Sequence, residues 1–129
     1  MVFDLLFSLL SALRTRGKRP GPSPASLPPM TRVLVTGGAG TIGSAVVRRL
    51  LRDPAYDVRV SDQREAPQWM REGCEVHTGD LRVLEQARAA TAGCSHVIHL
   101  AAIVGGIANF HKLPYTLTEV NNALYNGVV

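Results

Sequence analysis

"VLVTGGAGTIGSAVVRRLL", from Val33 to Leu51, places four glycines within seven residues, between an apolar run and a segment with helical periodicity. Val33–Thr36 is rich in β-branched residues and too short for a helix, which predicts a strand. After the glycines, apolar residues recur at helical spacing until Asp53-Pro54: Ile42, Val46, Val47, Leu50 and Leu51. The stretch therefore predicts a strand, a glycine-rich turn and a helix.

The chain continues with the same alternation. Three further strands are predicted at "DVRVSD" (57–62), "CEVHTGD" (74–80) and "HVIHLAA" (96–102). Helices or helical turns are predicted at "APQWMREG" (66–73), from Leu84 to Ala92 with an end at Gly93, and over 113–129. Strands separated by helices imply right-handed crossovers and a parallel sheet.

Residues 1–29 differ in composition from the rest and divide into "MVFDLLFSLLSAL", "RTRGKRP" and "GPSPASLPP". Five prolines between positions 20 and 29 favour a flexible linker. Met30 stands directly before "TRVLVTGG", so the first predicted strand follows a methionine closely, as at the start of a protein. We expect residues 1–29 to be a spurious or disordered extension and residues 30–129 to form the domain. The alternative is that the apolar piece is a targeting helix or a helix that lies on a membrane surface. It is far too short to span a membrane.

The formal net charge of +4 is concentrated in that extension. Residues 1–29 carry four basic residues and one acid, whereas residues 30–129 carry ten basic and nine acidic residues. A near-neutral body with few aromatic residues argues against a nucleic-acid partner.

The two cysteines, Cys74 and Cys94, match neither a disulfide framework nor a zinc motif. We interpret both as small buried residues of a cytoplasmic protein. A metal site at Cys94 with His96 and His99 is disfavoured, because positions 96 and 99 of a strand face opposite ways.

The glycine-rich turn matches the spacing G-x-G-x-x-G through Gly38, Gly40 and Gly43. In that pattern the first glycine permits the tight turn, the second lets the backbone approach a pyrophosphate, and the third lets the helix pack closely on the strand. A helix beginning near Thr41 directs its unpaired N–H groups and its positive dipole end toward the phosphates. The turn therefore predicts a dinucleotide-binding site.

Asp62 stands nineteen residues after Gly43, at the end of the second predicted strand. A carboxylate there accepts hydrogen bonds from the adenosine ribose and repels a 2′-phosphate, which favours NAD over NADP. Arg64 keeps NADP as the alternative. Together these features predict an α/β fold, the N-terminal half of a Rossmann doubly wound parallel sheet. We expect about four strands in the order 3-2-1-4, truncated before a fifth strand.

From Thr31 to Val129 the chain resembles the extended short-chain dehydrogenase/reductase family, the NAD-dependent nucleotide-sugar epimerases and dehydratases. The glycine loop of that family, TGxxGxxG, is matched by Thr36, Gly37, Gly40 and Gly43. A Gly-Asp-Leu element, the strand "VIHLAA" and the helix "EVNNALYNGVV" follow in the order found in the family.

The resemblance implies a role for each motif. The Asp80 side chain and the Leu81 backbone would border the adenine, Ala101 and Ala102 would lie beside the nicotinamide riboside, and Asn121 would support the active site. The plain alternatives are a turn-forming Asp80, a locally bonded Asn121 and a tight core at the two alanines. The expected cofactor-binding residues are thus Gly37, Gly38, Gly40, Thr41, Ile42, Gly43, Asp62, Asp80, Leu81, Ala101 and Ala102.

The segment "AAIVGGIANF", residues 101–110, is similar to a loop of GDP-fucose synthases and related GDP-sugar epimerases. Asp62 departs from the NADP-using synthases, so the resemblance favours an NAD-dependent epimerase with a similar loop. A plain turn at Gly105-Gly106 explains the segment equally.

The chemistry of the family needs a tyrosine with a lysine four residues later, so that the tyrosine exchanges a proton with a sugar hydroxyl while hydride moves to or from NAD. None of the three tyrosines meets this condition: Val60, Glu119 and Val129 follow Tyr56, Tyr115 and Tyr125 at that distance. Apart from a supporting Asn121, we therefore expect no catalytic residue in this chain.

We interpret the sequence as the NAD-binding, N-terminal fragment of a nucleotide-sugar epimerase or dehydratase. The resemblance implies a homodimer for the full-length relative. The alternatives are a short dinucleotide-binding or partner-completed module without catalysis, a fragment of an NADP-dependent GDP-sugar epimerase-reductase, and a non-functional product of a truncated gene.

Overall fold

The structure is a computed structural model that describes residues 30–104, 106, 112 and 114–129. Strands and helices alternate in this part of the chain: β1 (Thr31–Thr36), α2 (Thr41–Leu50), β2 (Tyr56–Asp62), α3 (Gln68–Gly73), β3 (Glu75–Thr78), α4 (Leu84–Thr91), β4 (His96–His99) and α6 (Pro114–Val128). The predicted alternation is therefore confirmed. The expectations for residues 1–29, and those for Gly105 and residues 107–110 of the segment 101–110, lie outside the described residues.

The four strands form one parallel sheet in the order β3-β2-β1-β4. Val35 at the centre of the sheet is in register with Val60 of β2 and Ile98 of β4. The structure confirms the predicted α/β class and strand order. The strand order reverses between β1 and β4, because β2 and β3 lie on one side of β1 and β4 lies on the other.

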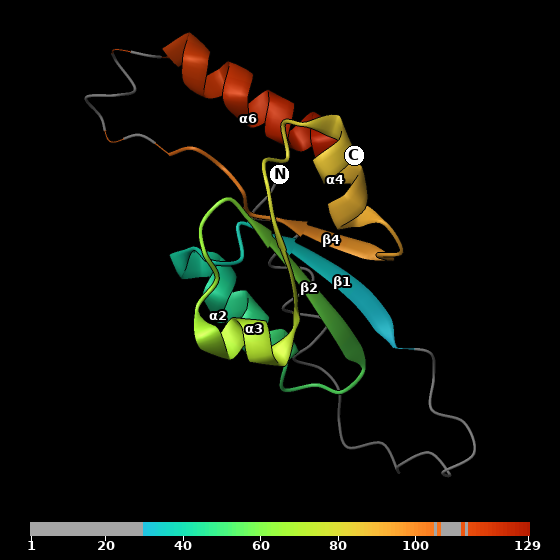
Figure 1. Cartoon of the computed structure of the whole chain (residues 1–129). Coiled ribbons are helices and arrows are strands. Elements are labelled where there is room, and N and C mark those ends of the chain that lie inside the picture. The colour runs from blue at the N-terminus through green and yellow to red at the C-terminus, as the bar shows by residue number, and fades with distance from the viewer. Residues whose placement is uncertain (1–29, 105, 107–111, 113) are drawn as a thin grey trace, which may run out of the picture.

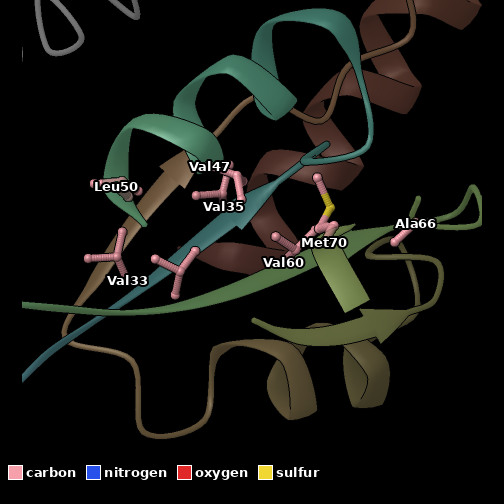
Figure 2. Packing of buried hydrophobic residues seen from close by; sticks show 8 residues of the cluster. Val33, Val35, Val47, Leu50, Val60, Ala66 and Met70 are labelled. Atoms are coloured by element: carbon pink, nitrogen blue, oxygen red, sulfur yellow. The ribbon is translucent and has the colours of Figure 1, made fainter. Parts of the chain in front are cut away.

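Helices cover both faces of this sheet, with α2 and α3 on one face and α4 and α6 on the other (Figure 1). Side chains of β1 alternate between the two layers, as the pleat of a strand requires. Val33 and Val35 pack with Val47 and Met70 on the side of α2 and α3, as Figure 2 shows. Leu34 points the other way and joins a second cluster, which contains Leu81 of the turn before α4, Ala87 and Ala90 of α4, and Leu124 of α6.

The helix after the glycines buries only part of its predicted apolar stripe. Val47 and Leu50 are buried, whereas Ile42 and Leu51 are 62% and 36% exposed. Leu51 lies past the last helical residue as the C-cap, and Ile42 lies in the first turn, where it lines a cavity. The inward face of the helix is therefore shorter than the spacing of its apolar residues indicates.

Arg59 links the second strand to the end of α4. Its neighbours on the strand face the other layer, whereas the Arg59 guanidinium donates to the carbonyl oxygens of Ala90 at 2.9 Å and Ala92 at 2.7 Å. These carbonyls lie at the end of α4, where a cation satisfies unpaired acceptors and the negative end of the helix dipole. Glu75 of β3 lies 3.0 Å from Arg59 Nε and balances the charge.

Both cysteines are partly rather than fully buried, which corrects the interpretation from sequence. Cys74 donates its S–H to the carbonyl oxygen of Met70 at 3.0 Å, and burial raises the pKa of its thiol to about 11. Burial also raises the pKa of the Cys94 thiol. No helix in the described part of the chain is both long and apolar enough to cross a membrane.

Candidate functional site

The turn after β1 depends on the absence of a side chain at Gly37. Its φ of +68° is one that L-residues rarely adopt, and a Cβ there would lie 2.8 Å from the backbone nitrogen of Ala101. Gly38 lies in the same turn, but the left-handed conformation falls on Gly37, since the described glycines with positive φ are Gly37 and Gly93. Gly38 instead lets the loop pack on β2, since a Cβ there would lie 2.5 Å from Val60 Cγ1.

Gly43 lets the first turn of α2 pack on the glycine loop. A Cβ at Gly43 would collide with the carbonyl oxygen of Gly37 and lie 2.7 Å from the Cα of Gly38. Gly40 is the N-cap of α2 and supplies no side-chain cap, so the N–H groups of the first turn have neither an intrahelical partner nor a side-chain cap from Gly40. The loop and the helix start thus form a main-chain cradle with positive character.

A cavity of about 660 Å³ lies beside this cradle, at the carboxyl ends of the strands where the strand order reverses. Ligands of open α/β sheets bind at such a position. Nine of the expected cofactor-binding residues line the cavity: Gly37, Gly40, Thr41, Ile42, Gly43, Asp62, Leu81, Ala101 and Ala102. Gly38, Asp80 and Asn121 do not line it.

Asp62 lies at the end of β2 on the cavity wall, and its side chain is 8% exposed. One carboxylate oxygen accepts the backbone N–H of Ala39 in the glycine loop at 3.0 Å, and the other accepts that of Arg64 at 3.0 Å. A carboxylate has about four acceptor positions, so this one retains capacity for further donors. Asp62 therefore holds the loop and still offers acceptors to a ligand.

Arg64 extends beside the same carboxylate with a largely exposed side chain. Its Nε lies 3.4 Å from Asp62 Oδ1, and its Nη2 lies 3.1 Å from the position that a Cβ on Gly40 would occupy. A cation thus lies next to the loop as well as an anion. Asp62 and Arg64, on which the predicted choice between NAD and NADP depends, therefore lie next to each other.

Asp80 turns toward Arg82 rather than into the cavity. Arg82 Nη2 lies 2.6 Å from Asp80 Oδ2, and the hydrogen bonds from Arg82 lower the pKa of the Asp80 carboxyl to about 2. The backbone N–H of Asp80 donates to Gln86 Oε1 of α4 at 2.6 Å, which holds this turn against the helix. Leu81, the next residue, is buried and lines the cavity.

The end of β4 lies against the end of β1. Thr36 is fully buried, and its hydroxyl oxygen accepts the backbone N–H groups of Leu100 at 3.1 Å and Ala101 at 3.2 Å. This contact leads the chain past Gly37 and places Ala101 and Ala102 on the cavity wall. The small side chains keep this side of the cavity open.

Asn121 of α6 makes two hydrogen bonds to one residue of the loop after β4. Its Oδ1 accepts the backbone N–H of Ile103 at 2.8 Å, and its Nδ2 donates to the carbonyl oxygen of Ile103 at 3.1 Å. Ile103 lines the cavity, so Asn121 acts on the site by holding its wall.

Several lining residues were missed by the sequence reasoning: Ser61, Gln63, Gly79, Arg82, Leu100, Ile103, Val104, Val120 and Leu124. Gln63 directly follows a predicted strand, Leu100 lies in the last part of another, and the carboxyl ends of parallel strands meet at one edge. That rule could have identified them. Val120 and Leu124 carry no such signal, because their position depends on how α6 packs.

The family model of the NAD dependent epimerase/dehydratase family matches residues 33–128, and the chain belongs to this family. It is 32% identical over 94 residues to GDP-mannose 3,5-epimerase 1 of Oryza sativa subsp. japonica, covering 72% of this chain and 25% of the relative. It is 39% identical over 99 residues to human 3 beta-hydroxysteroid dehydrogenase type 7, covering 68% of this chain and 25% of the relative.

Among solved structures, the chain is similar to the UDP-glucose 4-epimerase of Thermus thermophilus, crystallised in complex with NAD. The TM-score is 0.64 at 32% sequence identity, over 76% of this chain and 32% of the epimerase. The chain thus spans about a quarter of the length of the curated relatives quoted above.

Proposed function

We propose that this chain is the NAD-binding part of a nucleotide-sugar epimerase or dehydratase. The observation that carries the proposal is the cavity between a glycine-rich loop and the Asp62 carboxylate. The loop is suited to binding a dinucleotide. Its backbone N–H groups and the N-terminus of α2 attract a pyrophosphate, and its glycines let the pyrophosphate approach the backbone closely.

Each part of the cavity wall then has a role. Gly37, Gly40 and the first turn of α2 hold the pyrophosphate, Asp62 holds the adenosine ribose, and Ala101 and Ala102 lie beside the nicotinamide riboside. Asn121 supports that wall through Ile103. A bound nicotinamide ring supplies hydride transfer. The chain holds no tyrosine followed four residues later by lysine, so we expect no turnover from these residues alone.

The nucleotide-sugar substrate rests on relatives, since GDP-mannose 3,5-epimerase and UDP-glucose 4-epimerase are named for such substrates. A 3β-hydroxysteroid is the second candidate, because the human relative named for it is 39% identical over 99 residues. Saturation-transfer NMR on the NAD-loaded chain, with GDP-mannose and a 3β-hydroxysteroid as competing ligands, distinguishes the two candidates. A signal from the steroid alone overturns the nucleotide-sugar assignment.

The first prediction concerns cofactor choice and uses titration calorimetry of the full chain. NAD binds more tightly than NADP, and Asp62→Ala narrows the difference by about 1–2 kcal/mol, the scale of a charge-assisted hydrogen bond. Because Asp62 also accepts the backbone N–H of Ala39, the substitution weakens the binding of both NAD and NADP. Only the difference between the two binding free energies therefore reports on the contact with the ribose.

Asp53→Ala is the control, since Asp53 likewise bonds to the backbone, accepting the N–H of Ala55 at 3.0 Å, but lies at the other end of the sheet. It leaves the difference between NAD and NADP unchanged. Equal affinities of the wild-type chain for NAD and NADP contradict the assignment. A preference for NADP that Arg64→Ala removes makes Arg64 the determinant instead.

A further inference from the structure

The Thr36 hydroxyl makes three contacts inside the protein. Its oxygen accepts the backbone N–H groups of Leu100 and Ala101 at 3.1 and 3.2 Å, and it lies 2.8 Å from Nδ1 of His99. Thr36 is 0% exposed, so water does not replace any of these partners. Three residues at the end of β4 thus converge on one oxygen of β1.

Proton counting assigns a direction to the third contact. A hydroxyl has one proton and two lone pairs, and a backbone N–H acts only as a donor. Ala101 donates to one lone pair of the Thr36 hydroxyl oxygen, and Leu100, whose backbone N–H is shared with the Thr36 carbonyl oxygen at 3.2 Å, donates to the other. With both lone pairs used in this way, the single hydroxyl proton is left for His99, and Nδ1 is then the acceptor and carries no proton. A neutral imidazole with an acceptor Nδ1 carries its proton on Nε2.

We propose that His99 is a positioning residue of the dinucleotide site. As the neutral Nε2–H tautomer it takes the hydroxyl proton of Thr36 and so turns both lone pairs of that oxygen toward Leu100 and Ala101. This arrangement holds the turn that brings Ala101 and Ala102 to the cavity. The link to the nicotinamide side rests on the proposed function, whereas the tautomer and the turn do not.

The surroundings of His99 suit a neutral ring. Burial lowers the pKa of its imidazole, and the ring of Tyr125 on α6 lies edge-on with the ring centroids 6.3 Å apart. A neutral strand histidine that merely fills space between β1 and α6 also favours the Nε2–H tautomer, which is the intrinsically preferred form of the neutral ring. A proton on Nδ1 therefore excludes the proposal, and the hydrogen exchange of two amides separates positioning from simple packing.

The direct test is long-range 1H–15N NMR of the histidine side chains in the full-length, 15N-labelled chain at neutral pH, without cofactor. We expect the nitrogen shifts of the Nε2–H tautomer for His99. A ring protonated on Nδ1, alone or together with Nε2, overturns the proposal. This measurement needs only the wild-type chain, so it can overturn the proposal even if the variants fail to fold.

The second test is amide hydrogen exchange in variants. His99→Phe keeps a planar ring without the acceptor, and we expect exchange at Leu100 and Ala101 to rise about tenfold relative to Val97, as for one lost hydrogen bond. His99→Asn, whose Oδ1 restores an acceptor, reverses most of the increase. His96→Phe is the control on the same strand, because His96 is exposed and its Nδ1 contacts only the adjacent Ser95 among the described residues.

Unchanged exchange at Leu100 and Ala101 in His99→Phe contradicts the proposal, and so does a rise that His99→Asn fails to reverse. Both readouts are taken without cofactor. A chain that has the predicted tautomer and exchange but binds no NAD therefore refutes the proposed function and leaves the role of His99 in the turn intact.

Discussion

Gly37 and Gly93 adopt nearly the same left-handed backbone, with φ of +68° and +72°, but in different surroundings. A Cβ at Gly37 would meet the backbone of Leu100 and Ala101, whereas a Cβ at Gly93 would have no atom within 4 Å. Gly93→Ala therefore costs only the backbone conformation, about 1–2 kcal/mol of the free energy of unfolding. Gly37→Ala adds steric overlap of about 1–3 kcal/mol and weakens NAD binding.

Urea unfolding of both variants, with calorimetric titration of NAD, measures these effects. Gly93→Ala serves as the matched control for the backbone term and should bind NAD like the wild-type chain. Equal losses of stability in the two variants contradict the close approach at Gly37.

Residue types and spacing predicted the glycine loop and Asp62, but not which glycine has the positive φ. Gly38 satisfies the spacing of the motif, whereas Gly37 has the positive φ. Gly37 is the glycine that lies against the backbone of Leu100 and Ala101, where the chain leaves β4 beside β1. The hydrogen bonds of the Thr36 side chain could not be predicted from local sequence either, since His99 lies 63 positions away along the chain. Local patterns identify a loop, and tertiary contacts decide the role of each residue in it.

Helix α6 docks on the turn after β3 through Gly127. A Cβ at this position would collide with the carbonyl oxygen of Leu81 and lie 3.2 Å from Ala87 Cβ. In an exposed helix, Gly→Ala stabilises by about 1 kcal/mol. Here the overlap with rigid backbone reverses the sign, and we expect Gly127→Ala to destabilise the chain by about 1–2 kcal/mol net.

Thermal unfolding followed by circular dichroism measures the change. Asn126→Ala, at an exposed position of the same helix, is the control and should keep or slightly raise the melting temperature. A more stable Gly127→Ala variant shows that α6 does not pack this closely on Leu81.

Element types and their order were predictable, because each apolar stripe has a period of two or of about 3.6 residues. The contacts between elements were not. Arg59 interrupts an apolar strand with a charge, and no pattern within the strand indicates that its partners are carbonyls about 30 residues later in α4. Similarly, the pairing of Asp80 with Arg82 depends on a turn held by Gln86.

At the scale of the whole molecule, the edge formed by β4 governs how copies of this chain behave at high concentration. Among the described strands, β4 pairs with β1 alone, so its other edge presents unpaired backbone groups. Ser95 donates its N–H toward β1, to Arg32, and alternation along the strand turns the N–H of His96 to the open edge. We expect the chain to self-associate through this edge.

Light scattering over a concentration series tests this expectation. His96→Pro removes an outward N–H and should lower the average mass while largely keeping the melting temperature. Val97→Pro is the matched contrast, because it removes an N–H that faces β1 and should unfold the sheet. A wild-type chain that stays monomeric throughout the series refutes the association.

The cradle beside the cavity is built from main chain, and this has an evolutionary consequence. Its loop offers backbone N–H groups, which every residue except proline possesses. A substitution that shortens a nearby side chain therefore leaves these donors in place. Adding one carbon at Gly37 or Gly43, in contrast, fills space that the loop itself needs. Such a site tolerates extensive drift in the surrounding sequence while a few positions remain closed to every residue that carries a Cβ. The fold can therefore persist among relatives that share only about a third of their residues with this chain.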